Sequence, residues 1–257
     1  MRGKGINYDT GFIPGGHLSR PLFDPAQAAK EMRVIARDLH CTAVRITGGD
    51  PARLEVAGRL AAAAGLEVWF APFPCELSPE ENLAMLAECA GLAEGLRQSG
   101  AEVVFVAGCE LSLFGTGFVP GAAFSDRIGG LGRVDLSAVC ARLSDFLGAA
   151  AAEARTRFGG KITYAAGPWE EIDWTPFDIV AVDGYRGAEN RAYFDWDIRR
   201  RFRHGVLSKT SLGLSKDQEV TSSVEHPFVA RHLGNTVGLG NKRCGKEKQT
   251  CTLVSFV

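Results

Sequence analysis

The sequence predicts one α/β domain, a (β/α)8 TIM-type barrel that is either complete or incomplete and irregular after its sixth strand. Its 257 residues are close to the roughly 250 typical of such a barrel. Short apolar segments alternate with longer amphipathic ones, which is the order of parallel βαβ units. Six units follow without a change of pattern. This favours a barrel, and a doubly wound sheet is the alternative.

Six apolar segments are predicted as strands. Several are almost continuously apolar, as in Val103-Val104-Phe105-Val106, which is typical of strands covered on both faces. The six segments are residues 3–8, 42–46, 67–71, 102–107, 161–166 and 178–182.

Helices are predicted between these strands from their capping residues. Asp24, Asp50 and Ser78 each precede a proline, the arrangement of an N-cap followed by proline at the first helical position. Gly65 follows the second helix as a C-terminal glycine. The predicted helices cover residues 24–39, 50–64, 78–100, 135–158 and 189–202, with a short crossover over 169–176.

The last fifth of the chain departs from this pattern. Up to Leu207 the basic residues are 19 Arg and 3 Lys, and from Ser208 onward they are 2 Arg and 5 Lys. We therefore divide the chain into a barrel body, residues 1–205, and a divergent tail, residues 206–257, that replaces strands seven and eight. Residues 252–257 are an eighth strand or merely an apolar end. A frameshift, a fusion or a mispredicted exon would each produce such a shift, and sequencing the transcript across codons 200 to 215 tests this.

Composition excludes several classes of partner. A formal net charge of -1 argues against nucleic acid, and no stretch approaches the ~20 apolar residues of a membrane span. The N-terminus lacks the apolar region of a signal peptide, so a cytoplasmic location is expected. Seven dispersed cysteines do not form a disulfide framework, and no zinc spacing is present. We expect no metal, no cofactor, and a small-molecule or carbohydrate substrate; the oligomeric state is left open.

Polar residues gather where the predicted strands end, the active-site edge of a barrel. Glu110 follows a strongly apolar strand, where low-dielectric surroundings suit a general acid. The alternative is a structural carboxylate paired with Arg45. Asp183 and Tyr185 lie two residues apart after the sixth strand and are expected to share a face. Asp183 could instead cap the next helix.

The other predicted site residues support these carboxylates. Arg45 could hold a carboxylate through a bidentate contact, and Asp9 is a ligand, a base or a turn residue before Thr10 and Gly11. An aromatic cluster beside carboxylates suits sugar rings, although any single aromatic is more often buried packing. The predicted substrate-binding residues are Asn7, Asp9, Arg45, Trp69, Trp169, Glu170 and Tyr185, and Phe73 and Trp174 are expected on the same face as the two tryptophans.

Several segments carry a resemblance over residues 1–205. Residues 4–11, 44–50 and 104–114, with Gly167-Pro168-Trp169-Glu170 and residues 182–186, resemble a family of uncharacterised actinobacterial barrel proteins labelled "abortive infection protein". That label describes a phage-defence phenotype rather than a reaction.

More distantly, the layout is similar to clan A-type glycoside hydrolase barrels. The resemblance implies an acid/base Glu after strand four, matched by Glu110, and places around the nucleophile matched by Arg45 and Tyr185. Two departures stand out. Cys109 occupies the position where those enzymes usually have Asn, and the Glu after strand seven has no match.

These observations predict a glycosidase-like hydrolase with Glu110 as general acid/base, supported by Arg45, Asp183 and Tyr185. Glu110 and Asp183 are the predicted catalytic residues, and either Asp183 or Glu170 could supply the second carboxylate in an inverting arrangement. The missing strand-seven carboxylate would impair the hydrolase. The alternative is a non-catalytic binding or phage-defence protein on a barrel scaffold. The discriminating observation is a second carboxylate near Glu110, roughly 5 to 5.5 Å away for a retaining enzyme or 6.5 to 9.5 Å for an inverting one.

Overall fold

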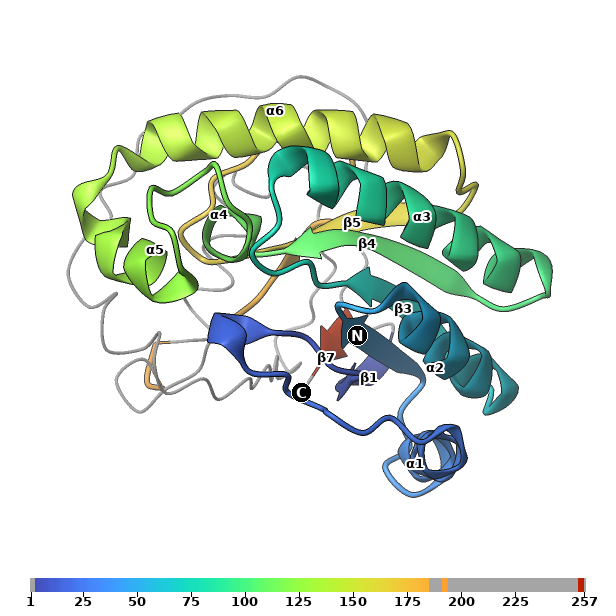
Figure 1. The fold of residues 1–257 in the computed structure, drawn as a ribbon. Helices are drawn as coiled ribbons and strands as arrows, with labels where there is room; N and C mark the ends of the chain where they lie inside the picture. Colours follow the sequence, from blue (N-terminus) through green and yellow to red (C-terminus); the bar gives the residue numbers. More distant parts are fainter. Residues whose placement is uncertain (1–2, 185–190, 194–253, 257) are drawn as a thin grey trace.

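The computed structural model describes residues 3–184, 191–193 and 254–256. Its strands form one parallel sheet with the order β6-β5-β4-β3-β2-β1-β7. The first five strands are β1 (Gly3–Asp9), β2 (Ala43–Gly48), β3 (Glu67–Pro72), β4 (Val103–Cys109) and β5 (Lys161–Ala166). The edge strands are β6 (Ala181–Val182) and β7 (Val254–Phe256). Sequential pairing of β1 to β6 is the order of a (β/α) barrel, and the described strands make a curled, incomplete one (Figure 1).

Four long helices connect the strands and cover the outer face of the sheet (Figure 1). They are α1 (Pro25–Arg37), α2 (Pro51–Ala63), α3 (Pro79–Gln98) and α6 (Leu136–Arg155). The predicted caps are confirmed: Asp24 and Asp50 accept backbone N–H bonds, and Ser78 forms a capping box with Glu81. None of the described helices is long and apolar enough to cross a membrane.

Two regions differ from the prediction. The segment after β4 contains short helices that the sequence analysis did not predict, namely α4 (Leu111–Phe114), α5 (Phe124–Gly130) and the 3-10 turn η2 (Leu131–Arg133). A further 3-10 turn, η1 (Pro14–Gly16), follows β1. The crossover from β5 to β6 is short, as expected, and contains only turns and bends. Of the predicted helix over 189–202, only residues 191–193 are described, and they form a turn. The boundary at 205 lies outside the described residues.

The strand β7 pairs in parallel with β1, with Gly3 opposite Val254 and Gly5 opposite Phe256. This is the position that an eighth strand takes in a closed barrel. Of the two readings of residues 252–257, the structure therefore supports the strand.

The two faces of the sheet have different cores. The outer face packs against the helices through a continuous cluster that includes Val44, Phe70, Phe105 and Tyr164. The inner face holds a smaller cluster around Trp69, Val104 and Val106. The strands are in register so that Asn7, Arg45, Trp69 and Val104 are Cα partners in sequence across four strands. Their side chains therefore share the inner face, because a regular strand turns alternate residues to opposite faces.

Candidate active site at the strand ends

An irregularity at the end of β4 turns Cys109 toward the inner face. Val104 and Val106 belong to the inner cluster, so strict alternation would place Gly108 there and Cys109 outside. Instead the register with β5 shifts between Val106 and Cys109, and Gly108 has a φ of 94°. A bulge of this kind re-aims the side chain that follows it. Gly108 was the sequence signal for this turn.

Three side chains from β4 and β6 meet at this point. Cys109, Glu110 and Asp183 each offer one ligand atom, and these atoms all lie within 4.8 Å of one another. Glu110 and Asp183 are separated by 73 positions in the sequence, yet β4 and β6 bring them together across β5. The predicted catalytic pair is thus close in space, and a second carboxylate stands near Glu110.

Asp183 is held by two partners. Its Oδ1 accepts a hydrogen bond from Arg45 Nη1 at 2.8 Å, and its Oδ2 accepts one from Cys109 Sγ at 3.1 Å. Burial raises the pKa of the Cys109 thiol well above its ordinary value, so this group remains a thiol that can donate. The side chains of Arg45 and Asp183 are 9% and 17% exposed.

Arg45 pairs with Asp183, so the alternative in which it pairs with Glu110 as a structural carboxylate is not supported. The expected bidentate fork is absent, because Nη1 makes the contact and Nε is buried without a partner among the described residues. Although burial alone would lower its pKa, the neighbouring Asp183 carboxylate raises the pKa of Arg45 and keeps it charged.

Glu110 occupies an unusual backbone conformation. Its φ and ψ of 44° and 42° are left-handed, which is uncommon for a residue other than glycine. Its amide donates to the Ala165 carbonyl, and its own carbonyl accepts from Leu113 and Phe114. The residue is only 2% exposed. Strained residues of this kind persist only where surrounding contacts hold them, and they gather at functional sites.

The same three groups could in principle hold a metal ion, since thiol and carboxylate atoms are common ligands. However, the guanidinium of Arg45 bonds directly to Asp183 and places a fixed positive charge there. A second cation at this point would be repelled. The set fits a ligand rich in hydroxyl groups better than it fits a metal.

Asn7 and Trp69 flank Arg45 on the inner face. Asn7 is the register partner of Arg45 on β1, and its Oδ1 is buried without a hydrogen-bond partner in the described part of the chain. Trp69 partners Arg45 on β3 and is buried. Asp9 instead shows the turn role, because its Oδ1 accepts from the amide of Gly11 at 2.7 Å.

The expected aromatic face does not form as one surface. Trp69 and Phe73 belong to the inner cluster, whereas Trp169 and Trp174 belong to the outer core. Glu170 hydrogen-bonds with Tyr164, a member of that outer core, and is itself 3% exposed. The physical reason is the short crossover after β5, which folds back over the outer side of the sheet. Tyr185 lies outside the described residues.

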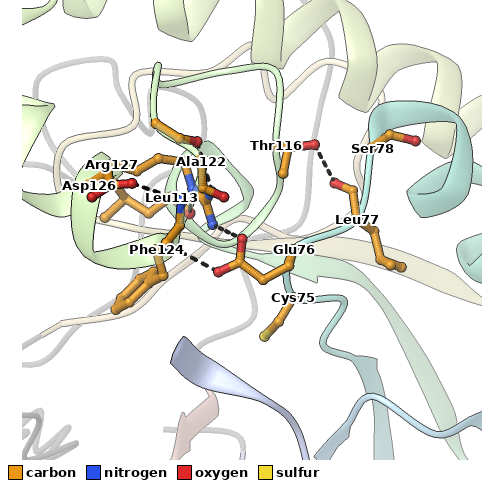
Figure 2. Close-up of polar contacts among 12 residues, drawn as sticks. Cys75, Glu76, Leu77, Ser78, Leu113, Thr116, Ala122, Phe124, Asp126 and Arg127 are labelled. Carbon is orange, nitrogen blue, oxygen red and sulfur yellow. Dashed lines mark hydrogen bonds and ion pairs between the residues drawn. The ribbon is translucent and has the colours of Figure 1, made fainter. Parts of the chain in front are cut away.

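The loops at the strand ends are fastened by a buried arginine that the sequence analysis missed (Figure 2). Arg127 is fully buried; its Nη2 donates to Glu76 Oε2 at 2.6 Å, and its Nε donates to the Leu113 carbonyl. The other oxygen of Glu76 accepts from the amide of Phe124. This clamp joins the loop after β3 to the insertion after β4. No short motif signals it, because its partners are mostly carbonyls.

Comparisons with known proteins give structural matches only. No family model matches the chain, and no curated protein matches it. Among solved structures, a complex of a GH113 β-1,4-mannanase is similar with a TM-score of 0.51 at 15% identity, covering 79% of this chain and 68% of that one. A GH113 β-mannanase from Alicyclobacillus acidocaldarius is similar with a TM-score of 0.50 at 16% identity, covering 77% and 66%.

At this identity the likeness concerns the fold. It supports an incomplete (β/α) barrel, in agreement with the strand order. The resemblance to the abortive infection family has no support from these comparisons.

Proposed function

We propose that this protein is a glycoside hydrolase in which Glu110 is the general acid/base and Asp183 is the second carboxylate. The observation that carries the proposal is the approach of one oxygen of each to within 4.8 Å at the ends of β4 and β6. Glycoside hydrolysis needs two carboxyl groups flanking the bond, and a separation of roughly 5 to 5.5 Å characterises retaining enzymes. The short separation therefore favours retention over inversion.

The two carboxyl groups have environments suited to different tasks. Asp183 is fixed by an ion pair and a thiol hydrogen bond, which orients its oxygens for attack on the anomeric carbon. Attack would form a covalent glycosyl–enzyme ester while Glu110 gives its proton to the leaving oxygen. Water, deprotonated by Glu110, would then cleave the ester and restore both groups.

The inner face supplies the surface for a sugar. Asn7, Arg45 and Trp69 lie side by side in register and combine polar atoms with an aromatic ring. Buried polar atoms without partners among the described residues, such as Asn7 Oδ1 and Arg45 Nε, can be satisfied by substrate hydroxyl groups. Because the structural neighbours are β-1,4-mannanases, β-linked manno-oligosaccharides are the first substrates to test.

The test separates the two roles by the leaving group. Wild-type, Glu110→Gln, Asp183→Asn and the exposed control Glu171→Gln are assayed with unactivated β-manno-oligosaccharides and with a dinitrophenyl β-mannoside. We expect Glu110→Gln to lose about 10²- to 10⁴-fold on the oligosaccharide. It should lose far less in the first step on the dinitrophenyl substrate, whose leaving group needs no proton. Asp183→Asn should fail on both substrates, and Glu171→Gln should behave as wild type.

Product stereochemistry gives a second readout. Proton NMR of early product should show the anomeric configuration of the substrate retained. Full activity in Glu110→Gln would remove the assignment of the acid. Binding of mannosides without turnover in wild type would instead support the alternative of a non-catalytic carbohydrate-binding barrel.

A further inference from the structure

The turn that carries Glu110 is fastened from the outer side of the sheet. The amide of Leu111 donates to Tyr164 Oη at 2.7 Å, and the amide of Ser112 donates to Glu170 Oε1 at 3.0 Å. The Ser112 hydroxyl accepts from the indole of Trp169 at 2.9 Å. The two residues directly after Glu110 are therefore held by three side chains of β5 and the crossover behind it.

Glu170 is the centre of this network. Its Oε2 accepts from Tyr164 Oη and from the amide of Gly167, both at 2.9 Å, while Oε1 accepts from Ser112. Tyr164 and Ser112 are completely buried and Glu170 is nearly so. A buried carboxyl group is costly to desolvate unless its partners are well placed. Its hydrogen bonds to three separate segments point to a role in fixing their relative positions.

We propose that Glu170 is a positioning residue for Glu110: it fixes the Leu111–Ser112 turn, directly and through Tyr164, and thereby holds Glu110 in its left-handed conformation. This inference rests on the proposed function of Glu110. It replaces the expected substrate contact of Glu170, whose carboxyl group is enclosed on the outer side of the sheet, with an indirect role. A Cβ on Gly167 would come within 2.6 Å of the Trp169 ring, so a glycine there allows this ring to close over the turn.

The protonation of Glu170 is coupled to the same contacts. Burial raises the pKa of Glu170 to about 7, against the opposing effect of the hydrogen bonds from Ser112, Gly167 and Tyr164. Burial also keeps Tyr164 a neutral phenol by raising its pKa. Protonated Glu170 can still accept from the Ser112 and Gly167 amides. Its proton and the Tyr164 hydroxyl proton then compete for the single contact between Oε2 and Oη, so titration changes the Tyr164–Glu170 hydrogen bond while the two amide bonds persist. Among the described residues, the titratable groups facing this pair include Cys109 on β4, which acts on Tyr164, and Cys140 on α6, which lies near Glu170.

The first test observes the turn without requiring a substrate. Backbone amide NMR spectra are recorded for wild-type, Glu170→Gln, Tyr164→Phe and the exposed control Glu171→Gln between pH 5 and pH 9. We expect the Ser112 and Gly167 amides of wild type to shift in one transition near pH 7. The transition should vanish in Glu170→Gln and persist in Glu171→Gln. A ¹³C-carboxyl titration of Glu110 should move in Glu170→Gln and Tyr164→Phe.

The second test measures kcat and KM on the substrate found for wild type. Misplacing a catalytic group by about 1 Å can cost 10²-fold, so we expect kcat to fall roughly ten- to a hundredfold in Glu170→Gln with KM nearly unchanged. Unaltered Leu111 and Ser112 amides and an unaltered Glu110 titration in both variants would overturn the positioning role. If those signals move but wild type hydrolyses no glycoside, the proposed function fails while the positioning role stands. Should Glu170→Gln not fold, Tyr164→Phe carries the same test, because it removes the acceptor of the Leu111 amide and the hydrogen bond to Glu170 while leaving the Ser112 and Gly167 amides bonded to Glu170.

Discussion

The outer and inner faces of the same sheet differ in their balance of apolar and polar side chains. The outer face joins β-strands and helices through a continuous apolar cluster, in which Phe70, Phe105 and Leu143 are fully buried. The inner face mixes a small apolar cluster with Arg45, Asn7 and the Cys109–Asp183 pair, and two of its buried polar atoms have no partner in the described structure. The contrast fits the proposed function, in which the outer face provides stability and the inner face binds the substrate.

The largest expected effect comes from the outer face. Phe70→Ala removes a fully buried ring between β3 and the helices. Phenylalanine-to-alanine changes in cores typically cost 3–5 kcal/mol, the sum of lost transfer free energy and an unfilled cavity. We expect the unfolding free energy, measured by urea denaturation followed by circular dichroism, to fall by about that amount. A loss below about 1 kcal/mol would contradict the assignment of stability to this face.

Glu170 is a buried carboxyl group within the outer face, and its ionisation should make stability depend on pH. Its folded pKa is raised from 4.5 to about 7, so the folded state binds more protons than the unfolded state between these values. The unfolding free energy contributed by Glu170 is therefore fully present below pH 4.5, declines as pH rises to about 7, and is constant above it. The loss is on the order of 3 kcal/mol.

The measurement is the difference in unfolding free energy between wild type and Glu170→Gln at several pH values. Other carboxyl groups contribute to both proteins and cancel. Between pH 4.5 and pH 7, the unfolding free energy of wild type should fall relative to that of the variant. A difference that does not change with pH would show that Glu170 titrates normally in the folded protein.

The difference between the outer and inner faces also explains which features could be predicted from the sequence. The strands of the outer core follow from continuous apolar runs such as Val103-Val104-Phe105-Val106, and the helices from caps such as Asp50 and Ser78. These signals are local. Glu110 and Asp183 could also be assigned to strand ends from the sequence, because active sites of (β/α) barrels lie at the C-terminal ends of the strands.

The sequence could not predict which side chains contact each other when they lie far apart in the chain. Arg45 pairs with Asp183, 138 residues away, rather than with Glu110, because the curl of the sheet brings β2 and β6 together. Trp169 and Glu170 follow a strand end as Glu110 does, yet the crossover folds them to the outer side. Arg127 bonds mainly to carbonyl groups, which every residue carries and no sequence pattern reveals.

A smaller effect is expected from the ion pair on the inner face. Asp183→Asn leaves the buried guanidinium of Arg45 without its counter-charge. Breaking a fully buried pair costs 3–5 kcal/mol, and because the Asp183 side chain is 17% exposed, we expect roughly 2 kcal/mol. The double variant Arg45→Met/Asp183→Leu removes both charges and should recover most of the stability while losing all activity. If the double variant is less stable than Asp183→Asn, the pair stabilises the fold, and the division between the faces is weaker than proposed.

The smallest expected effect concerns the partly exposed N-cap of α2. Asp50 caps α2 by accepting from the amides of Ala52 and Arg53, and its side chain is about half exposed. Replacing such a cap by alanine costs about 1 kcal/mol. Asp50→Asn preserves the acceptor and should cost less, which separates the hydrogen bond from the charge at the helix N-terminus. Both variants should keep the wild-type kcat, since α2 packs on the outer face. A fall in kcat for Asp50→Ala would mean that the ends of the outer helices set the geometry of the inner face, so that the two faces are coupled through the loops between them.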